Sequence, residues 1–145
     1  MKRIVTITMN PALDSSTSVQ QVVAEDKLRC RAPSHEPGGG GINVSRAISH
    51  LGGESTTVFL AGGPNGELLT SLLQNEGIAC SPIRVAANTR NNLVVNERTS
   101  DRQYRFAMPG GTVERAEWEG VLSELEDLSP TPDFVVASGS LPPGV

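Results

Sequence analysis

The sequence predicts an α/β fold: a doubly wound, mostly parallel sheet with a second, small antiparallel sheet attached to it as a lid. Two observations support this fold class. Short apolar, β-branched runs alternate with amphipathic helical stretches, which is the pattern of βαβ units in a sheet buried on both faces. Two other segments, near residues 16–32 and 90–107, each contain two more polar strands joined by a turn and not by a helix. This pattern is typical of an antiparallel sheet with one solvated face.

Size and composition favour one globular domain that binds a small ligand. The chain has 145 residues, of which 37% are hydrophobic and 19% charged, so it is long and apolar enough to bury a core. The net charge of −4, with Arg and Lys scattered singly, argues against nucleic acid or an anionic membrane as a partner. No apolar run reaches the roughly 20 residues of a spanning helix, and the N-terminus does not resemble a secretory signal. We therefore expect a cytoplasmic protein.

The chain begins with a core strand followed by polar strands of the lid. Residues 4–9 are rich in β-branched side chains and end at Asn10-Pro11, a turn signal. Between residues 14 and 37 no helical period develops, and the short apolar runs predict two strands, near 16–20 and 27–32, around a turn at Glu25-Asp26.

A glycine run then opens the first helix. Gly38–Gly41 leads directly into a helical stretch whose apolar face is predicted to contain Val44, Ala47, Ile48 and Leu51, and Gly52-Gly53 ends it. Residues 56–61 form a second core strand. A second helix follows, marked by Leu68, Leu69, Leu72 and Leu73 and closed by Gly77.

The last third of the chain adds a hairpin, a helix and a strand. A short strand is expected near residues 83–85. Two lid strands then flank a turn at Ser100-Asp101, with Leu93 and Val95 predicted to face Tyr104 and Phe106. A helix ends before Pro130 and carries Trp118, Val121, Leu122, Leu125 and Leu128 at helical spacing, and residues 134–138 form the final strand. The lid strands are thus placed within about 14–36 and 88–108.

Three segments are expected to meet at one edge of the main sheet. In open parallel sheets the loops after the strands converge at the carboxyl ends, where ligands bind. Asp14, the glycine run and Ser138 should all lie there. The carboxylate of Asp14 suits sugar hydroxyls, although a turn or capping carboxylate beside Pro11 explains the same spacing.

The glycine run is an ambiguous signal by itself. Four consecutive glycines remove every Cβ from a loop at a helix N-terminus, so a polar or anionic ligand can approach backbone N–H groups closely. The run is neither a Walker A loop nor a GxGxxG fingerprint, and a tight turn accounts for it equally well. Asn43, in the first helical turn, favours a site because its amide can reach a bound hydroxyl.

Two basic residues of the lid segments, Arg90 and Lys27, are candidates for binding phosphate. Arg90 could hold a phosphate with two N–H groups, although on the residues alone an ordinary surface arginine is favoured. Lys27 could bind phosphate as a point charge, and a solvated lysine is an equal alternative. Arg105 alternates with Tyr104 and Phe106, and the sequence leaves open which face it occupies. We interpret Cys30, Cys80, His35 and His50 as ordinary packed or solvated residues, because none shows metal-ligand, disulfide or catalytic spacing.

Six segments, in order and at fitting separations, resemble the minor (type B) 6-phosphofructokinases of the ribokinase-like sugar kinases. They are TMNPALD, KLRCRAPSHEPGGGGINVSRAISHLGG, AGGPNGELL, TRNNL, QYRFAMPG and SGSLPPG, and they cover essentially the whole chain. Relatives acting on fructose 1-phosphate or tagatose 6-phosphate typically have GGKG at the loop. The glycine at position 40 therefore favours fructose 6-phosphate as the substrate.

The resemblance implies a ribokinase-like fold and a role for each candidate. It assigns sugar contacts to Asp14, Gly38, Gly39, Asn43 and Ser138, a substrate-phosphate contact to Arg90, and a weaker phosphate or nucleotide contact to Lys27. It also implies a homodimer formed through the lid.

The resemblance also implies that the catalytic base lies outside this chain. The family transfers a phosphoryl group from MgATP with an Asp base in a Gly-Ala-Gly-Asp motif, and that motif is absent. The chain therefore resembles the N-terminal half of such an enzyme. We expect the base beyond Val145, in a C-terminal half that also supplies the Mg²⁺ ligands and most of the nucleotide site. The 145-residue chain should be inactive alone.

Three alternatives remain open on the sequence. The complete protein could act on another sugar phosphate, as a tagatose-6-phosphate kinase or a 1-phosphofructokinase does. The chain could be a non-catalytic module that binds a sugar phosphate. It could also be the nonfunctional product of a truncated reading frame.

Overall fold

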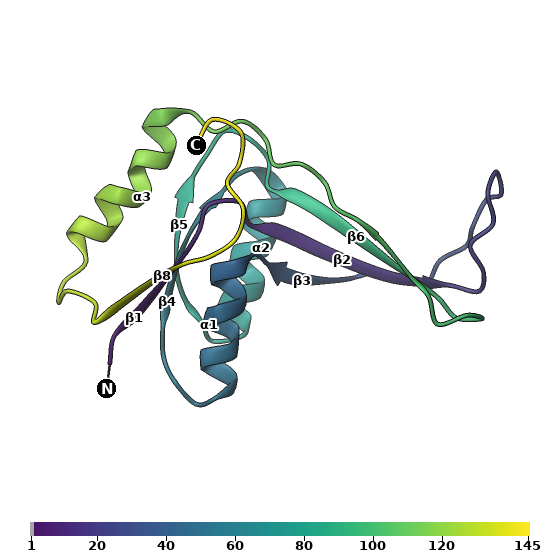
Figure 1. Ribbon diagram of the computed structural model, residues 1–145, viewed down its shortest axis with the longest axis horizontal. Coiled ribbons are helices and arrows are strands. Elements are labelled where there is room, and N and C mark those ends of the chain that lie inside the picture. Colours follow the sequence, from purple (N-terminus) through teal and green to yellow (C-terminus); the bar gives the residue numbers. More distant parts are fainter. Residues whose placement is uncertain (1) are drawn as a thin grey trace.

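The computed structural model describes residues 2–145 as two four-stranded sheets with three helices (Figure 1). The main sheet has the order β5-β4-β1-β8, and all its neighbouring strands are parallel. Its strands are β1 (Ile4–Thr8), β4 (Thr56–Ala61), β5 (Ala79–Arg84) and β8 (Phe134–Ala137). The helices are α1 (Gly40–His50), α2 (Gly63–Asn75) and α3 (Arg115–Asp127). No helix among the described residues is long and apolar enough to span a membrane.

Helices pack on both faces of the main sheet and bury its central strands, β1 and β4, which confirms the predicted doubly wound α/β fold. Along β4, Val58 and Leu60 join one apolar cluster, and this cluster contains Val121 of α3. The alternate residues Phe59 and Ala61 join a second cluster, which is completed by Ile42 of α1, Leu69 and Leu73 of α2, and Ile78 between α2 and β5. Successive strand residues point to opposite faces, so helices on both sides explain why β4 is continuously apolar from Val58 to Ala61.

The predicted buried face of the first helix is wrong. In α1 the buried residues are Gly41, Ile42 and Ser45, whereas Leu51 is 88% exposed. The helix docks on β1 through small and polar groups, with a hydroxyl–hydroxyl hydrogen bond of 2.8 Å between Ser45 and Thr6. A hydrophobic period cannot detect such a contact, because glycine and serine do not count as apolar side chains.

Strand β5 begins earlier than the sequence indicates, at Ala79 instead of residue 83. Its first half contains Ser81 and Pro82, which hide the strand in an apolar pattern. Because β5 is an edge strand, Pro82 can lack a backbone N–H without breaking an internal ladder.

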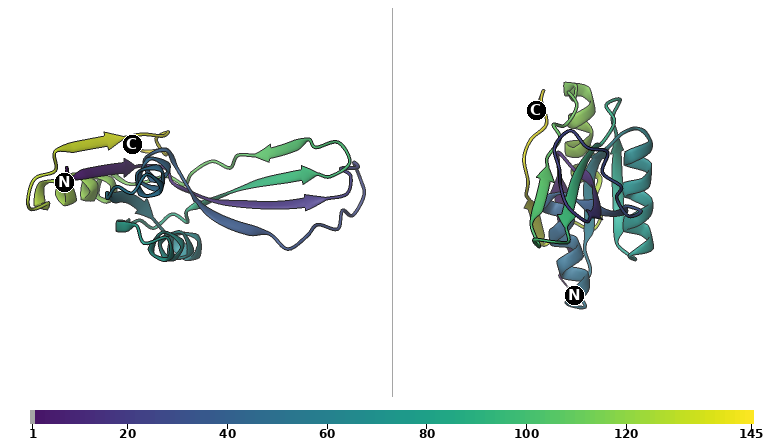
Figure 2. Two further views of the ribbon diagram at one scale, coloured as in Figure 1. Left: turned by 90° about the horizontal axis from the view of Figure 1, so that it is seen from below. Right: turned by 90° about the vertical axis from the view of Figure 1, so that its right-hand side faces the viewer.

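The second sheet, here called the lid, projects from the main sheet as a long, thin arm (Figure 2). It has the order β3-β2-β6-β7 and consists of β2 (Ala12–Val19), β3 (Ser34–Gly38), β6 (Arg90–Glu97) and β7 (Gln103–Phe106). The predicted hairpin register is confirmed, since Leu93 pairs with Phe106 and Val95 with Tyr104. The turn predicted at Glu25 is also present, with a φ of 62° at that residue.

The lid is a mixed sheet, which corrects the prediction that it is antiparallel. The two outer pairs are antiparallel, but the central pair, β2 and β6, is parallel. Both central strands leave the same edge of the main sheet, β2 directly after β1 and β6 after β5, so they run outward in the same direction (Figure 1). Sequence patterns carry no signal for the pairing of strands this far apart.

Two lid strands also differ from their predicted bounds. Strand β2 begins at Ala12, so Asp14 lies inside a strand and not in a turn. Strand β3 spans Ser34–Gly38 and not residues 27–32. Strand β3 consists of polar residues and Pro37, so its sequence shows no alternation of apolar residues. The strand forms because its backbone pairs with β2 at the edge of the lid.

Candidate functional site

All the sequence-predicted site residues except Lys27 gather where the lid joins the carboxyl edge of the main sheet. β1 and β8 end at this junction, α1 begins there, and β2 and β6 leave it to form the lid (Figures 1 and 2). A ligand at the junction would touch loops of the main sheet on one side and the first residues of the lid on the other, which is the usual ligand position in open α/β sheets.

Gly39, Gly40 and Gly41 are packed too closely against neighbouring atoms to carry side chains. Gly39 precedes α1 with a φ of 127°, and a Cβ there would lie 2.6 Å from the Thr8 methyl carbon. A Cβ at Gly40 would lie 2.6 Å from the hydroxyl oxygen of Ser138, and one at Gly41 would overlap the carbonyl of Ile7. The Gly41 N–H donates to the Ser138 carbonyl at 3.1 Å. The run and Ser138 therefore form one continuous wall.

Asp14 lies against the first glycine of the run. The registers place Ala12 beside Gly38 on β3, and Asp14 beside Asn92 on β6. The Asn92 amide donates to Asp14 Oδ1 at 2.9 Å, and a Cβ at Gly38 would lie 2.6 Å from Asp14 Cγ. The carboxylate is half-buried and neither caps a helix nor closes a turn beside Pro11.

Arg90 shares a lid face with Asp14 and holds together the segments that enter and leave the lid. It pairs with Ala12 on β2, two residues from Asp14, so both side chains project from the same face. Its guanidinium donates to the carbonyls of Asn10 (3.0 Å), Met108 (3.2 Å) and Pro11 (3.4 Å). A guanidinium has five N–H groups, so one N–H on each terminal nitrogen is left for a ligand.

The other candidates differ in how close they lie to this junction. Asn43 is exposed in the first turn of α1, next to the glycine run, and its backbone N–H donates to the Gly39 carbonyl at 2.8 Å. Arg105 pairs with Val94, which places it on the Asp14 face of the lid. Lys27 is exposed in the loop between β2 and β3. Figure 1 shows this loop at the free end of the lid, away from the junction. Asn92 was not singled out from the sequence, because nothing in a polar strand distinguishes one asparagine from the next.

Val145, the residue beyond which the catalytic base is expected, brings no reactive group to the site. Its side chain is aliphatic and 40% exposed, and its backbone N–H donates to the Pro142 carbonyl at 3.4 Å. The segment before it is tied to the chain that follows the lid, since the Pro143 carbonyl accepts the N–H of Val113 at 2.8 Å. A base beyond Val145 lies outside the described residues and stays a prediction.

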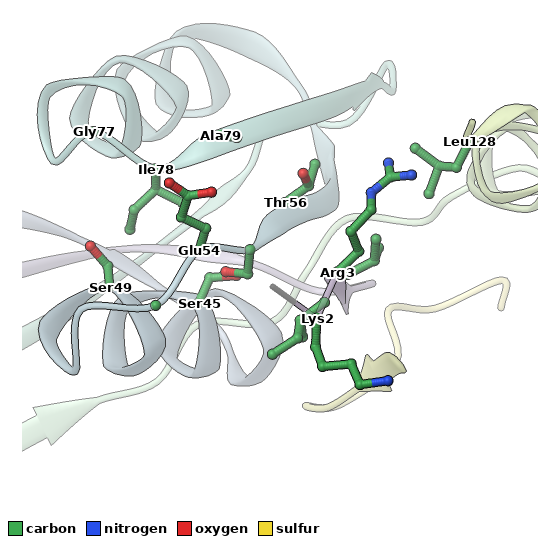
Figure 3. A pocket seen from close by; sticks show the side chains of 14 residues that line it. Lys2, Arg3, Ser45, Ser49, Glu54, Thr56, Gly77, Ile78, Ala79 and Leu128 are labelled. Carbon is green, nitrogen blue, oxygen red and sulfur yellow. The ribbon is translucent and has the colours of Figure 1, made fainter. Parts of the chain in front are cut away.

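The junction is open, and the larger cavities lie elsewhere. At the junction a small cavity of about 20 Å³ is lined by Arg90, Asn10 and Gly110 among others. A cavity of about 390 Å³ lies at the opposite end of the main sheet, where Ser49 and Glu54 stand on one side and Arg3 on the other (Figure 3). Another of about 390 Å³ lies beside α2 and the edge strand β5. Neither contains a residue predicted to bind the ligand.

The pKa perturbations among the described residues lie outside the junction. The Ser100 hydroxyl, the Val22 N–H and more weakly Arg102 hold the pKa of the Glu97 carboxyl below its ordinary value at the outer end of the lid. Burial raises the pKa of the Cys80 thiol in β5. Residues 2–145 contain no group of three or more His, Cys, Asp or Glu side chains arranged to hold a metal ion. The groups that the junction offers are hydrogen-bonding backbone and amide groups, the Asp14 carboxylate and the Arg90 guanidinium, which suit recognition of a polar ligand.

Comparison with known proteins gives close matches over the whole chain. A model of the pfkB family of carbohydrate kinases matches residues 7–145. An ATP-dependent 6-phosphofructokinase isozyme 2 of Mycobacterium tuberculosis is 52% identical over 143 residues, which are 99% of this chain and 42% of that protein. A 1-phosphofructokinase of Vibrio cholerae is 35% identical over 144 residues, 99% of this chain and 45% of the relative.

Solved structures of phosphofructokinase-2 from Escherichia coli match equally well. The complex with fructose-6-phosphate has a TM-score of 0.93 and 47% identity, over 100% of this chain and 48% of that one. The tetrameric inhibited form has a TM-score of 0.92 and 49% identity, over 100% and 47%. The chain thus spans about half the length of the relatives it matches.

Proposed function

Because the chain belongs to the pfkB family of carbohydrate kinases, we propose that its lid junction binds fructose 6-phosphate, as the substrate-binding half of an ATP-dependent 6-phosphofructokinase. The complete protein would transfer the γ-phosphoryl group of MgATP to the 1-hydroxyl and form fructose 1,6-bisphosphate. The M. tuberculosis relative is named for the phosphorylation of this sugar phosphate.

One observation carries the proposal: Asp14 and Arg90 project from the same lid face, two residues apart in register, beside the glycine wall. A carboxylate accepts hydrogen bonds from sugar hydroxyls, and a guanidinium donates to phosphate oxygens. The two chemical ends of a sugar phosphate therefore find matching groups at this junction. Gly38, Gly39 and Ser138 form the backbone wall against which the sugar would lie, and Asn43 adds an amide in the first turn of α1.

We propose that the remaining catalytic groups belong to a second half of the complete protein, beyond Val145. This half would correspond to the part of the relatives that the chain does not match. Phosphoryl transfer depends on a positioned base and on groups that neutralise the transferred phosphoryl. Residues 2–145 offer neither a Mg²⁺ ligand cluster nor a Walker A loop, so we assign the MgATP site to that other part as well. Lys27 is the weakest candidate for a nucleotide or phosphate contact, because it lies at the free end of the lid. The 145-residue chain should bind the sugar and show no turnover.

The exposed edge of the main sheet supports this division. Within residues 2–145, strand β8 pairs with β1 on one side and has no neighbour on the other, and Phe134 and Val135 are 55% and 50% exposed. Strands of all-parallel sheets are normally covered by further structure. We propose that the second half of the complete protein covers this edge.

The lid is proposed to join two copies into a homodimer. Its face opposite Asp14 carries Leu93, Val95, Tyr104 and Phe106, and Phe106 is 49% exposed. An apolar face on a thin, projecting sheet needs a covering partner. A relative solved in a tetrameric form supports self-association, and sedimentation of the chain would test it.

A 1-phosphofructokinase or a tagatose-6-phosphate kinase is the second candidate, and the V. cholerae relative favours the former. Two observations favour fructose 6-phosphate instead. Identity is 52% to the 6-phosphofructokinase and 35% to the 1-phosphofructokinase. Gly40 also packs against Ser138 so closely that a longer residue, as in the GGKG loops, would have to displace it.

Titration calorimetry with the 145-residue chain tests the proposal. We expect fructose 6-phosphate to bind more tightly than fructose 1-phosphate or tagatose 6-phosphate, and Asp14→Asn to weaken binding about tenfold or more, because a charge-assisted hydrogen bond is lost. Equal affinity for the three sugars would refute the substrate assignment. Absence of any binding would refute the site, and ATP-dependent turnover by the chain alone would refute the division of roles.

A further inference from the structure

We propose that Asn92 is a positioning residue, which holds the Asp14 carboxylate in the orientation that receives the sugar and connects it to the Arg90 guanidinium. The inference rests on the proposed function, since it concerns how the same junction recognises its ligand. Asn92 lies near the base of β6, half-buried, on the same lid face as both groups.

Both polar atoms of the Asn92 side-chain amide make hydrogen bonds. Its Nδ2 donates to Asp14 Oδ1 at 2.9 Å, and its Oδ1 accepts the backbone N–H of Met108 at 2.9 Å. Asp14, when ionised, can only accept hydrogen bonds, and a backbone N–H can only donate. An amide satisfies both neighbours at once, whereas a carboxylate at position 92 would have no proton to donate to Asp14.

Met108 continues this connection to Arg90. Its carbonyl accepts from Arg90 Nη1 at 3.2 Å, so both backbone polar groups of Met108 are held, one by each side chain. Asp14, Asn92, Met108 and Arg90 therefore form an unbroken chain of hydrogen bonds. This chain joins the group proposed to bind the sugar hydroxyls to the group proposed to bind the phosphate.

The carboxylate of Asp14 is confined between Asn92 and Gly38. Asn92 fixes Oδ1, and the space a Cβ at Gly38 would fill is occupied by the carboxylate itself. Without the Asn92 amide, the carboxylate of Asp14 can rotate about its side-chain bonds, and part of the binding free energy would be lost in ordering it again. Asn92 would thus act on the sugar through Asp14, without contacting it.

Asn96 provides a matched control. It is the other asparagine on the same face of β6 as Asn92, is also half-buried, and its side-chain amide donates to the Thr17 backbone carbonyl at 3.3 Å. If Asn92 only stabilised the lid, its substitution would affect ligand affinity no more than substitution of Asn96. A positioning role for Asn92 requires that only its substitution weakens ligand binding.

The experiment is a double-mutant cycle measured by calorimetric titration of the 145-residue chain with fructose 6-phosphate. We expect Asn92→Ala and Asn92→Asp to weaken binding by about tenfold, and Asn96→Ala to leave it unchanged. In an Asp14→Ala background, Asn92→Ala should have no further effect, because the group it positions is gone. Asn92→Asp keeps an acceptor for the Met108 N–H, so it serves as the second variant if Asn92→Ala folds poorly.

The outcomes separate the two ideas. Wild-type affinity in both Asn92 variants would overturn the positioning role and leave the proposed function intact. The same tenfold loss with and without Asp14 would show that Asn92 acts on the lid as a whole, which also overturns it. A wild-type chain that binds no fructose 6-phosphate would overturn the proposed function, and the role of Asn92 with it.

Discussion

Replacing Gly38 by alanine should separate ligand binding from stability. Gly38 is buried at the end of β3, and its φ lies outside the left-handed region, so alanine meets no backbone strain there. The added methyl group would lie 2.6 Å from Asp14 Cγ and would force the carboxylate away from its place beside Asn92. Because the displaced group is the end of a flexible side chain, the fold can accommodate the change.

We expect Gly38→Ala to change the free energy of unfolding only slightly and the affinity for the sugar phosphate strongly. Alanine in a strand gains roughly 0.5–1 kcal/mol over glycine, which offsets part of the lost hydrogen bond from Asn92. The free energy of unfolding should therefore change by about 1 kcal/mol or less. A misplaced Asp14 loses a hydrogen bond to the sugar of about 1.5–3 kcal/mol. At about 1.4 kcal/mol per tenfold change, affinity should fall roughly 10- to 100-fold.

Calorimetric titration with fructose 6-phosphate and urea unfolding of the same preparations measure the two effects. Gly77→Ala is the matched control, since Gly77 follows α2 with a φ of 74° and has open space around it. That substitution should lower stability by about 1 kcal/mol through backbone strain and leave affinity unchanged. Unchanged affinity in Gly38→Ala, or a loss of stability of several kcal/mol, would refute the placement of Asp14 against Gly38.

Three further predictions concern the fold. Gly41→Ala would place a methyl group 2.7 Å from the carbonyl carbon of Ile7, and because that neighbour is strand backbone, we expect a loss of about 1–3 kcal/mol or more in urea unfolding. Phe59→Ala should cost about 3–5 kcal/mol in the same assay, since Phe59 is fully buried between β4 and the two helices. The Glu97 carboxyl, with its folded-state pKa below the ordinary 4.5, stabilises the outer end of the lid above about pH 4.5, and this contribution is lost as the pH falls through the folded-state pKa. The protection of the Val22 amide against hydrogen exchange, relative to its intrinsic rate at each pH, should fall over that acidic range, and Glu97→Gln should remove the step; a pH-independent protection factor in the wild type would contradict the linkage.

Local signals were sufficient for much of the architecture. Strand β4 has the predicted bounds, because an apolar, β-branched run between turn residues has few other stable conformations. The hairpin register of Leu93 with Phe106 follows from alternation on either side of a short turn. The candidate residues Asp14, Gly38 and Arg90 were predicted from composition, spacing and resemblance, and the structure places them together at the junction.

Local sequence patterns did not predict a segment's contacts where its partner is distant in sequence. β3 is a polar edge strand, and α1 contacts β1 through Gly41 and Ser45, so neither interface has an apolar period. Asn92 was overlooked for the same reason: its two partners, Asp14 and Met108, are 78 and 16 residues away.

The sequence by itself determined the alternation of apolar strands and helices, the glycine run and the residue types at the junction. These depend on period and local conformational preference, which neighbouring residues carry. Only the tertiary structure decided that β2 and β6 run parallel, which brings Asp14, Asn92 and Arg90 onto one face. It also decided that Arg105 shares this face and that Lys27 does not reach the junction. Strand pairing across 78 residues, the separation of Asp14 and Asn92, is set by the global packing of the chain, and no local pattern encodes it.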